Sequence, residues 1–442
     1  MKKISFLRML IISLLGFALT FSSNIQDPPL MTFKTRQLAP DLPNTVLGIL
    51  GFVGLLVAMA VQPIVGVFSD RARTKLGRRL PFLIGGAVLI AASLFLLVAA
   101  PTLWVLLLGV ILIQFSSNIL QGPWQALIPD LVPESQRGTA SSLKGVMDIV
   151  ALVVGGLVAG KILSVGVERW GNNGVFFAAA VPTVVFFVFV TFTAIWAREK
   201  PSSAAEPAAN PVPQKSLAEA LRGAFYVNFR ENRIFGWWFT NRILFWGSFI
   251  AINTFLINYM VDVIGMKQTD AQSFYGNLKL ILGGALIVLA LLSGWLSDRI
   301  GRKPIMLAAG FVAFAGALLL LFVRSNTLIT IAGAIVGMGI GAFITVSWAL
   351  ATDIVPRHEA ARYLGIANIA TCIGSGVARL LGGVLIDPIN KLLGSSTYGY
   401  LSLFALATLC FLASALVIIP LPNKRKTALP EDVPVVVEET KV

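Results

Sequence analysis

Long apolar stretches separated by short polar segments dominate this 442-residue chain. A transmembrane helix needs about 20 predominantly apolar residues to cross the hydrocarbon core of a bilayer. The pattern therefore predicts an all-α polytopic membrane protein with twelve spans. We expect these spans near residues 5–25, 45–69, 81–100, 103–128, 139–163, 173–197, 234–260, 272–297, 303–323, 327–352, 362–386 and 398–420.

A polar stretch in the middle of the chain separates the first six spans from the last six. From Arg198 to Lys215 it reads REKPSSAAEPAANPVPQK, a composition typical of a linker rather than of a packed element. We expect an N-terminal six-helix bundle at 1–197, a cytoplasmic linker at 198–232, a C-terminal six-helix bundle at 233–421 and a cytoplasmic tail at 422–442.

A charged motif occurs at the same place in both sets of six spans. It combines a glycine, an Asp-Arg pair and a Gly-Arg-Arg or Gly-Arg-Lys triplet, and it follows the second span and the eighth. Two copies in the same order predict parallel repeats. We expect these groups to form an ionic gate; the alternative is that the cations only fix the topology. The candidate gate residues are Gly66, Asp70, Arg71, Gly77, Arg78, Arg79, Asp130, Arg137, Gly294, Asp298, Arg299, Gly301, Arg302, Asp353 and Arg362.

The composition agrees with a membrane protein. Charged residues make up 13% of the chain, whereas a soluble protein has about 25%. The net charge of +14 lies in short clusters between the spans, as in cytoplasmic loops, which argues against a nucleic-acid partner. We therefore expect a multi-pass protein of the inner membrane with both termini in the cytoplasm. The single histidine and the two cysteines offer no metal site. We expect no cofactor and no enzymatic activity.

Polar residues inside the predicted spans are the candidates for a binding site, since such residues normally face a cavity or a partner. Four amides in the fourth span are spaced to share one helix face and suit a hydroxyl-rich solute. Aromatic rings with polar partners in later spans can stack on a sugar and bond its hydroxyls. In both cases the alternative is packing between helices. The candidate residues are Gln114, Asn118, Gln121, Gln125, Arg242, Trp246, Asn253, Trp348, Asn368 and Arg379.

A carboxylate inside a span is the natural carrier of a coupling proton. Asp148 lies one helical turn from Lys144 in the fifth span. The pair is either the coupling site or a neutral structural pair. Asp27, near the outer end of the first span, is a second coupling candidate.

Two stretches resemble a known family. The segment from Val61 to Gly66 with the charged motif after it, and the segment from Asn118 to Pro123, are similar to the plant sucrose transporters and the related glycoside–pentoside–hexuronide cation symporters. The resemblance implies the major facilitator fold and uptake of a glycoside coupled to a cation, usually H⁺. The plant pattern has an aspartate and an arginine in the fourth span where this chain has Gln114 and Gln125.

Together these features predict a secondary active transporter of a sugar or glycoside that works by alternating access. We expect a monomer in the lipid bilayer, with H⁺ or else Na⁺ as the coupling ion. The alternatives are an exporter of drugs or organic anions, which the cations Arg242, Lys279 and Arg379 favour, and a sugar uniporter.

Overall fold

The computed structural model describes residues 3–74, 76–196, 232–323, 325–354 and 360–421, and all regular elements in these ranges are helical. The predicted tail at 422–442 lies outside the described residues, as does the predicted linker at 198–232 apart from Asn232. For Asp70, Arg71 and Arg362 only the backbone is described.

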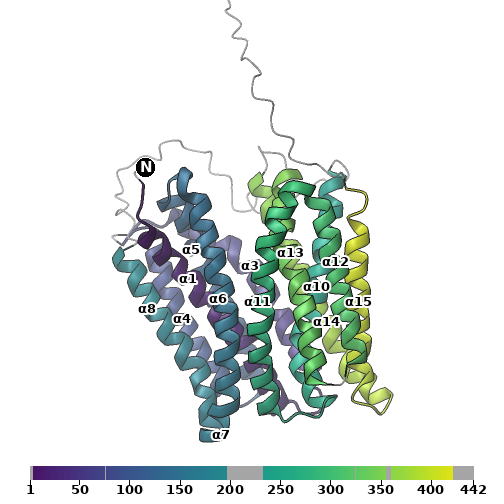
Figure 1. The fold of residues 1–442 in the computed structure, drawn as a ribbon. Helices are drawn as coiled ribbons and strands as arrows, with labels where there is room; N and C mark the ends of the chain where they lie inside the picture. Colours follow the sequence, from purple (N-terminus) through teal and green to yellow (C-terminus); the bar gives the residue numbers. More distant parts are fainter. Residues whose placement is uncertain (1–2, 75, 197–231, 324, 355–359, 422–442) are drawn as a thin grey trace, which may run out of the picture.

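The described part of the first half contains six long helical segments joined by short connections, as Figure 1 also shows. Its elements are α1 (Phe6–Ile25), η1 (Gln26–Leu30), α2 (Met31–Leu38), α3 (Pro43–Arg71), α4 (Leu80–Ala99), α5 (Leu103–Leu131), η2 (Glu134–Gln136), α6 (Arg137–Lys161), η3 (Ile162–Gly166), α7 (Val167–Trp170), η4 (Gly171–Phe176) and α8 (Phe177–Trp196).

The described part of the second half is simpler, with six long helices. They are α10 (Arg233–Asp262), α11 (Gln268–Ile300), α12 (Arg302–Phe322), α13 (Asn326–Ile354), α14 (Ala360–Leu392) and α15 (Tyr398–Val417).

The twelve-span prediction is confirmed. The described residues contain eleven segments long and apolar enough to cross a membrane, and the 60-residue segment Arg137–Trp196 holds two spans, α6 and α8. The helices form two parallel six-helix repeats.

The first span is longer than predicted. The expected end near residue 25 is only a break, because α1, η1 and α2 form one segment from Phe6 to Leu38. Asp27 leaves helical geometry at φ −129° and ψ 118°, and Pro28 and Pro29 follow it. Proline removes a backbone donor and interrupts the helical hydrogen bonds. In the sequence, Asp27, Pro28 and Pro29 resemble the end of a span. In the structure they interrupt the helix inside the first span.

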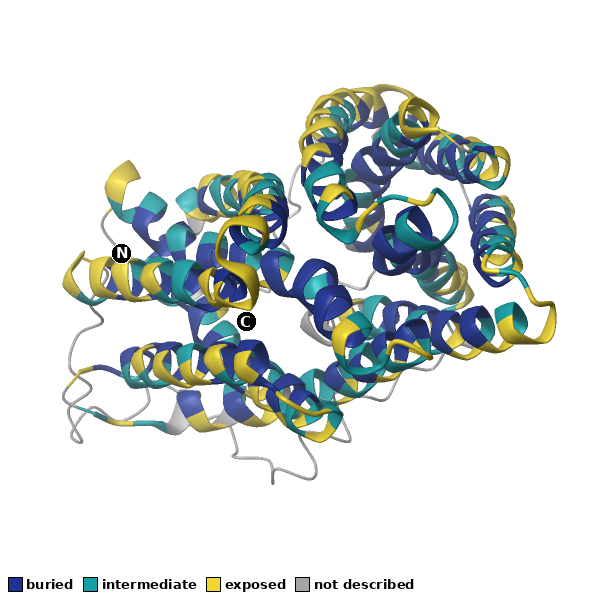
Figure 2. Cartoon of the chain, turned by 90° about the horizontal axis from the view of Figure 1, so that it is seen from below, coloured by how far each residue is buried: buried dark blue, intermediate teal, exposed yellow. Residues whose placement is uncertain are grey.

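We call the end of the molecule where α8 stops and α10 begins the terminal end, at the top of Figure 1, and the opposite end the distal end. Between the halves, α3 lies along α14, and α6 lies along α11. Figure 2, seen from the distal end, shows buried residues turned into the bundles and exposed residues on their outer faces.

Glycines allow both of these pairs of helices to approach closely. A Cβ atom added at Gly48 of α3 would lie 2.8 Å from the Cα atom of Gly383 in α14. At the other crossing, a Cβ atom at Gly160 would lie 3.2 Å from the Cα atom of Gly276. Small residues are common where membrane helices touch, because they let the backbones pack directly. The two halves therefore meet by direct backbone contact.

The outer faces of the bundles carry large apolar side chains. Trp104, Leu291 and Phe322 are 80%, 72% and 76% exposed. Apolar surface of this extent is unfavourable in water and favourable against lipid tails. The exposed surface thus fits a molecule embedded in a bilayer.

Candidate functional site

The break in the first span places a carboxylate at the boundary between the halves. Asp27 Oδ2 lies 2.5 Å from Nη2 of Arg379, which belongs to α14. Gly51 of α3 makes room for this arginine, because a Cβ atom there would lie 2.6 Å from Arg379 Nη1. A charged pair between η1 and α14 therefore joins the two halves inside the membrane-spanning part of the molecule.

A cavity of about 60 Å³ adjoins this pair. Asp27, Arg379 and Gln114 of α5 line it, together with Gln26 and apolar residues of α3, α4 and α5. The structure thus brings together three residues predicted from different spans. Amide, carboxylate and guanidinium groups beside apolar walls can bond a polar solute and pack against its hydrocarbon parts.

A second charged group approaches the same region from α11. Lys279 is only 4% exposed, and its Nζ atom donates to Asn253 Oδ1 at 2.7 Å. Tyr275 Oη donates to the same oxygen at 2.9 Å. Two turns before Lys279 on the same helix, Gln272 donates to the backbone oxygen of Pro29 at 3.0 Å, which places α11 beside η1. Asn253, a predicted binding residue, therefore holds a buried lysine near the ion pair.

Arg242 of α10 forms a separate cluster inside the second half. Its Nε atom donates to Thr371 Oγ1 at 2.9 Å, and Nη1 donates to Ser347 Oγ at 3.2 Å. The guanidinium also lies 4.5 Å from the ring centre of Trp348 and 5.5 Å from that of Trp238. These contacts fix a buried cation and orient one face of Trp348.

The other predicted binding residues occupy varied environments. Asn118 is buried and donates to the backbone oxygen of Gln114 in its own helix at 2.8 Å. Gln121 is half-buried and Gln125 is exposed. In the second half, Trp246 is half-buried and meets Phe249 edge to face, and Asn368 is exposed. Among the described residues that line the cavity, Gln114 is present and the other three amides of α5 are not.

Lys144 and Asp148 form the ion pair that their spacing allows. Lys144 Nζ lies 2.9 Å from Asp148 Oδ2, and Thr20 Oγ1 donates to Asp148 Oδ1 at 3.2 Å. The lysine also lies over the ring of Trp124, 5.2 Å from its centre. All four residues belong to α1, α5 and α6, so this pair connects helices within the first half.

The charged motif at the terminal end adopts the same geometry in both repeats. Arg79 pairs with Asp130 at 3.1 Å and donates to Ser69 Oγ at 2.6 Å. In the second repeat Arg302 pairs with Asp353 at 3.3 Å and donates to Ser297 Oγ at 2.5 Å. The two copies of the motif predicted from sequence therefore make corresponding contacts in the structure. Each of these ion pairs joins two elements of the same half.

Glycine is needed at one position of each motif. Gly77 and Gly301 have φ values of 99° and 98°, a region that other residues rarely adopt. Gly66 and Gly294 lie in helices. A Cβ atom at Gly66 would meet nothing within 4 Å, and one at Gly294 would meet Thr345 at 3.3 Å.

The remaining gate candidates make other contacts. Arg78 lies 3.7 Å from Asp130, and Asp298 lies 2.8 Å from Arg302. Arg299 stacks on Trp295, and Arg137 donates to the backbone oxygen of Val132.

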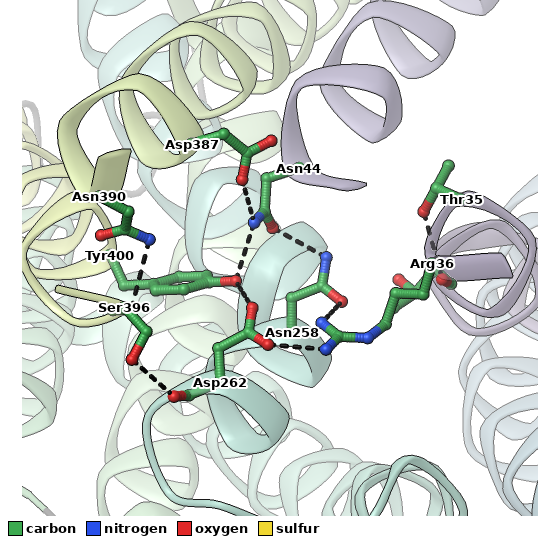
Figure 3. A network of polar contacts seen from close by, with 10 residues as sticks. Thr35, Arg36, Asn44, Asn258, Asp262, Asp387, Asn390, Ser396 and Tyr400 are labelled. Carbon is green, nitrogen blue, oxygen red and sulfur yellow. Dashed lines mark hydrogen bonds and ion pairs between the residues drawn. The ribbon is translucent and has the colours of Figure 1, made fainter. Parts of the chain in front are cut away.

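A polar cluster at the distal end was not predicted from sequence (Figure 3). Arg36 of α2 pairs with Asp262 of α10 at 2.7 Å and donates to Asn258 Oδ1 at 3.0 Å. Asn44 of α3 bonds to Asp387 of α14 at 2.8 Å and to Tyr400 of α15 at 2.9 Å. This distal cluster, comprising these six residues, bridges the two halves. In the sequence, the one feature that points to this cluster is that polar side chains lie near the ends of the predicted spans in a chain with few charged residues.

Asp387 also supplies the first turn of α3 with a cap from the opposite half. The backbone N–H of Thr45 donates to Asp387 Oδ2 at 2.7 Å, and the residue before α3, Leu42, makes no side-chain cap bond. A carboxylate at a helix N-terminus satisfies free N–H groups and interacts favourably with the helix dipole. The distal contact thus stabilises α3 as well as joining the halves.

The polar contacts between the halves lie at the centre and the distal end. Among the described residues they involve the distal cluster, Thr45 with Gly383, Gln272 with the backbone oxygen of Pro29, and the pair Asp27–Arg379. The charged pairs described at the terminal end stay within one half. The distal end is therefore held closed between the halves, and the terminal end carries no described polar bridge.

Comparisons with known proteins give consistent matches. Residues 30–420 match the family described as MFS/sugar transport protein. The minor myo-inositol transporter IolF of Bacillus subtilis (strain 168) is 33% identical over 145 residues, 32% of each chain. The sucrose transport protein SUT1 of Oryza sativa subsp. japonica is 35% identical over 112 residues, 20% of this chain and 21% of the relative. The chain thus matches only a third or less of the length of these two relatives.

The fold also matches solved structures. A crystal structure of a D-xylose-proton symporter superposes with a TM-score of 0.70 at 16% identity, covering 94% of this chain and 97% of the other. At this identity the likeness concerns the fold. The resemblance to sucrose transporters expected from the segments 61–66 and 118–123 is confirmed by the family match and the rice relative.

Proposed function

Because the chain belongs to the MFS/sugar transport protein family, we propose that it takes up a sugar or glycoside across the inner membrane by alternating access, in symport with H⁺. The observation that carries the proposal is the pair Asp27–Arg379, which joins the two halves beside the cavity. The two relatives described above are named as transporters of myo-inositol and sucrose, and a structural neighbour is named as a proton symporter of D-xylose. These names support a hydroxyl-rich solute here as well.

Asp27 is the favoured proton site. While it is ionised, its attraction to Arg379 holds η1 against α14. Protonation would remove that attraction and leave the guanidinium free to bond the solute or to move with α14. Asp148, the first candidate from the sequence, becomes the second here, because its partners Lys144 and Thr20 lie in its own half. A proton at Asp148 therefore acts less directly on the contact between the halves.

The distribution of charges supports the orientation. Arg73, Arg78 and Arg79 precede α4, and Arg299, Arg302 and Lys303 surround the start of α12, all at the terminal end. Clusters of Lys and Arg are retained on the cytoplasmic side during insertion. We therefore assign the terminal end to the cytoplasm, so that the conformation described here is closed toward the outside.

The test is uptake of labelled sugars into proteoliposomes with and without an inward proton gradient. Without a membrane voltage, one-to-one symport supports at most about tenfold accumulation for a gradient of one pH unit. We expect Asp27→Asn to abolish accumulation but to retain exchange of solute across the membrane, because the amide imitates the protonated carboxyl. Asp148→Asn should still accumulate the solute, and Asp41→Asn, at an exposed distal position, is the control.

The opposite pattern, with accumulation lost only in Asp148→Asn, would assign coupling to Asp148. Uptake by the wild-type protein that ignores the gradient would contradict symport and leave a uniporter. Failure to transport any sugar would contradict the substrate class.

A further inference from the structure

We propose that the solute carries one carboxylate, which binds beside Arg379 and Lys279 in the place that Asp27 occupies when no solute is present. This inference rests on the proposed transport function and specifies its substrate class as a sugar acid. It follows from the balance of charges at the centre of the molecule.

Cations outnumber carboxylates in this region. Lys279 and Arg379 approach it from α11 and α14, and Asp27 is the carboxylate that pairs with one of them. Within the described residues, Lys279 bonds to the neutral oxygen of Asn253 rather than to a carboxylate. Arg242, in its separate cluster, likewise bonds to the neutral oxygens of Ser347 and Thr371. The pair Lys144–Asp148 is neutral as a whole and does not change this balance.

Buried cations of this kind require an explanation. Lys279 is 4% exposed and Arg242 is 5% exposed. Removing a charge from water is costly unless an opposite charge or several hydrogen bonds compensate it. Lys34 shows how the fold does this elsewhere, since its buried ammonium donates to the backbone oxygens of Val98 and Ala100 at the end of α4. Within the described residues, the Lys279 ammonium donates to one amide oxygen and lies 5.0 Å from the ring centre of Tyr275, which leaves N–H donors for a bound anion.

The ion pair itself has unused bonding capacity. Arg379 Nε and Asp27 Oδ1 are both buried, and neither has a hydrogen-bond partner among the described residues. A guanidinium binds a carboxylate best through two parallel N–H bonds, whereas Asp27 engages Arg379 through Oδ2 alone. A carboxylate on a mobile solute can align with the guanidinium more freely than one fixed to η1.

Protonation of Asp27 makes the exchange of partners favourable. Once Asp27 is neutral, Arg379 loses the carboxylate that pairs with it, and the solute anion takes that place beside Arg379 and Lys279. A neutral sugar can bond the same groups but supplies no compensating charge. The site therefore prefers a solute with one negative charge, and the hydroxyl-bearing part of that solute lies toward Gln26 and Gln114 in the cavity.

The test is equilibrium binding to the purified protein, without any gradient. A panel of sugar acids, comprising hexuronic acids, their methyl glycosides and aldonic acids, is compared with the methyl ester of each acid, which has the same hydroxyls and no charge. We expect the tightest ligand to be an acid that binds at least tenfold tighter than its ester. Asp27→Asn, which imitates the protonated state, should tighten binding of the acid.

Lys279→Gln should reduce the preference of acid over ester to less than about threefold, whereas Lys303→Gln, at the terminal end, should leave it unchanged. If Lys279→Gln does not fold, the wild-type comparison of acid with ester still decides. The inference is overturned if the tightest ligand is neutral or if no acid binds. Failure of proton coupling is recognised separately, since it affects accumulation and leaves this equilibrium preference intact.

Discussion

Gly51 shows how much of the site depends on the absence of a side chain. Arg379 passes over this position to reach Asp27, and a Cβ atom at Gly51 would lie 2.7 Å from Arg379 Cδ. The arginine side chain is flexible enough to move aside. It could then no longer keep its position beside the carboxylate.

We predict that Gly51→Ala lowers gradient-driven accumulation at least tenfold without destabilising the protein. Alanine is favoured over glycine inside a helix by about 1 kcal/mol, so α3 itself should not suffer. Uptake assays and thermal unfolding of the purified variant measure the two effects. Gly85→Ala in α4 is the matched control, because a Cβ atom there meets nothing within 4 Å. Equal uptake by the two variants would contradict the role assigned to Arg379.

At the scale of elements, α3 begins with a cap that belongs to α14. The carboxylate of Asp387 accepts from Thr45 N–H and from the Asn44 side chain. These bonds exist only while the distal ends of the two helices are together. A cap of this kind contributes about 1 kcal/mol, and bonds to a charged group contribute more, about 1.5–3 kcal/mol. The cap therefore favours the conformation that is closed at the distal end.

We predict that Asp387→Asn shifts the protein toward an opening at the distal end, by about tenfold in population for each 1.4 kcal/mol lost. Spin labels at Trp104 and Leu392, which are 80% and 83% exposed, report the distance between the halves there. The longer of two distances should gain population in the variant. Asp41→Asn should leave the distribution of distances unchanged. If Asp387→Asn gives the same distribution as the wild type, the cap does not hold the distal end closed.

At the scale of the whole molecule, the described polar bridges between the halves lie at the centre and the distal end. With the proposed orientation, we expect water to enter between the halves from the cytoplasmic side. We predict that a cysteine at Gln125, which is exposed on α5, reacts with an impermeant maleimide in inside-out vesicles and not in right-side-out cells. A cysteine at the exposed distal position Asp41 should react from the opposite side. Labelling with reversed sidedness would contradict the orientation.

Much of this architecture could be predicted from sequence because each span must satisfy its own backbone hydrogen bonds within lipid. Because of that requirement, every span is an apolar stretch that can be recognised from its own residues alone. The repeat was equally visible, since both copies need a glycine with positive φ, at Gly77 and Gly301. The same reasoning misplaced the end of the first span, because Asp27 and the two prolines look like a loop.

The partners within the site could not be predicted in this way. Gln114, Asp27 and Arg379 were each recognisable as polar residues inside or near spans, but nothing local indicates that Asp27 meets Arg379. Asn44 and Asp387 are 343 residues apart and meet only because α3 and α14 cross. Pairing across a helix interface depends on the rotation and depth of both helices, and hydrophobic periodicity does not specify these quantities.

The surplus of cations around Asp27 also determines how far the membrane voltage can drive transport. Moving one elementary charge across 100 mV is worth about 2.3 kcal/mol. A neutral sugar accompanied by a proton would use that energy, whereas a monoanion accompanied by a proton carries no net charge and would be insensitive to voltage. Potassium diffusion potentials imposed on proteoliposomes should then leave uptake of the sugar acid unchanged, so that its accumulation follows the pH difference alone.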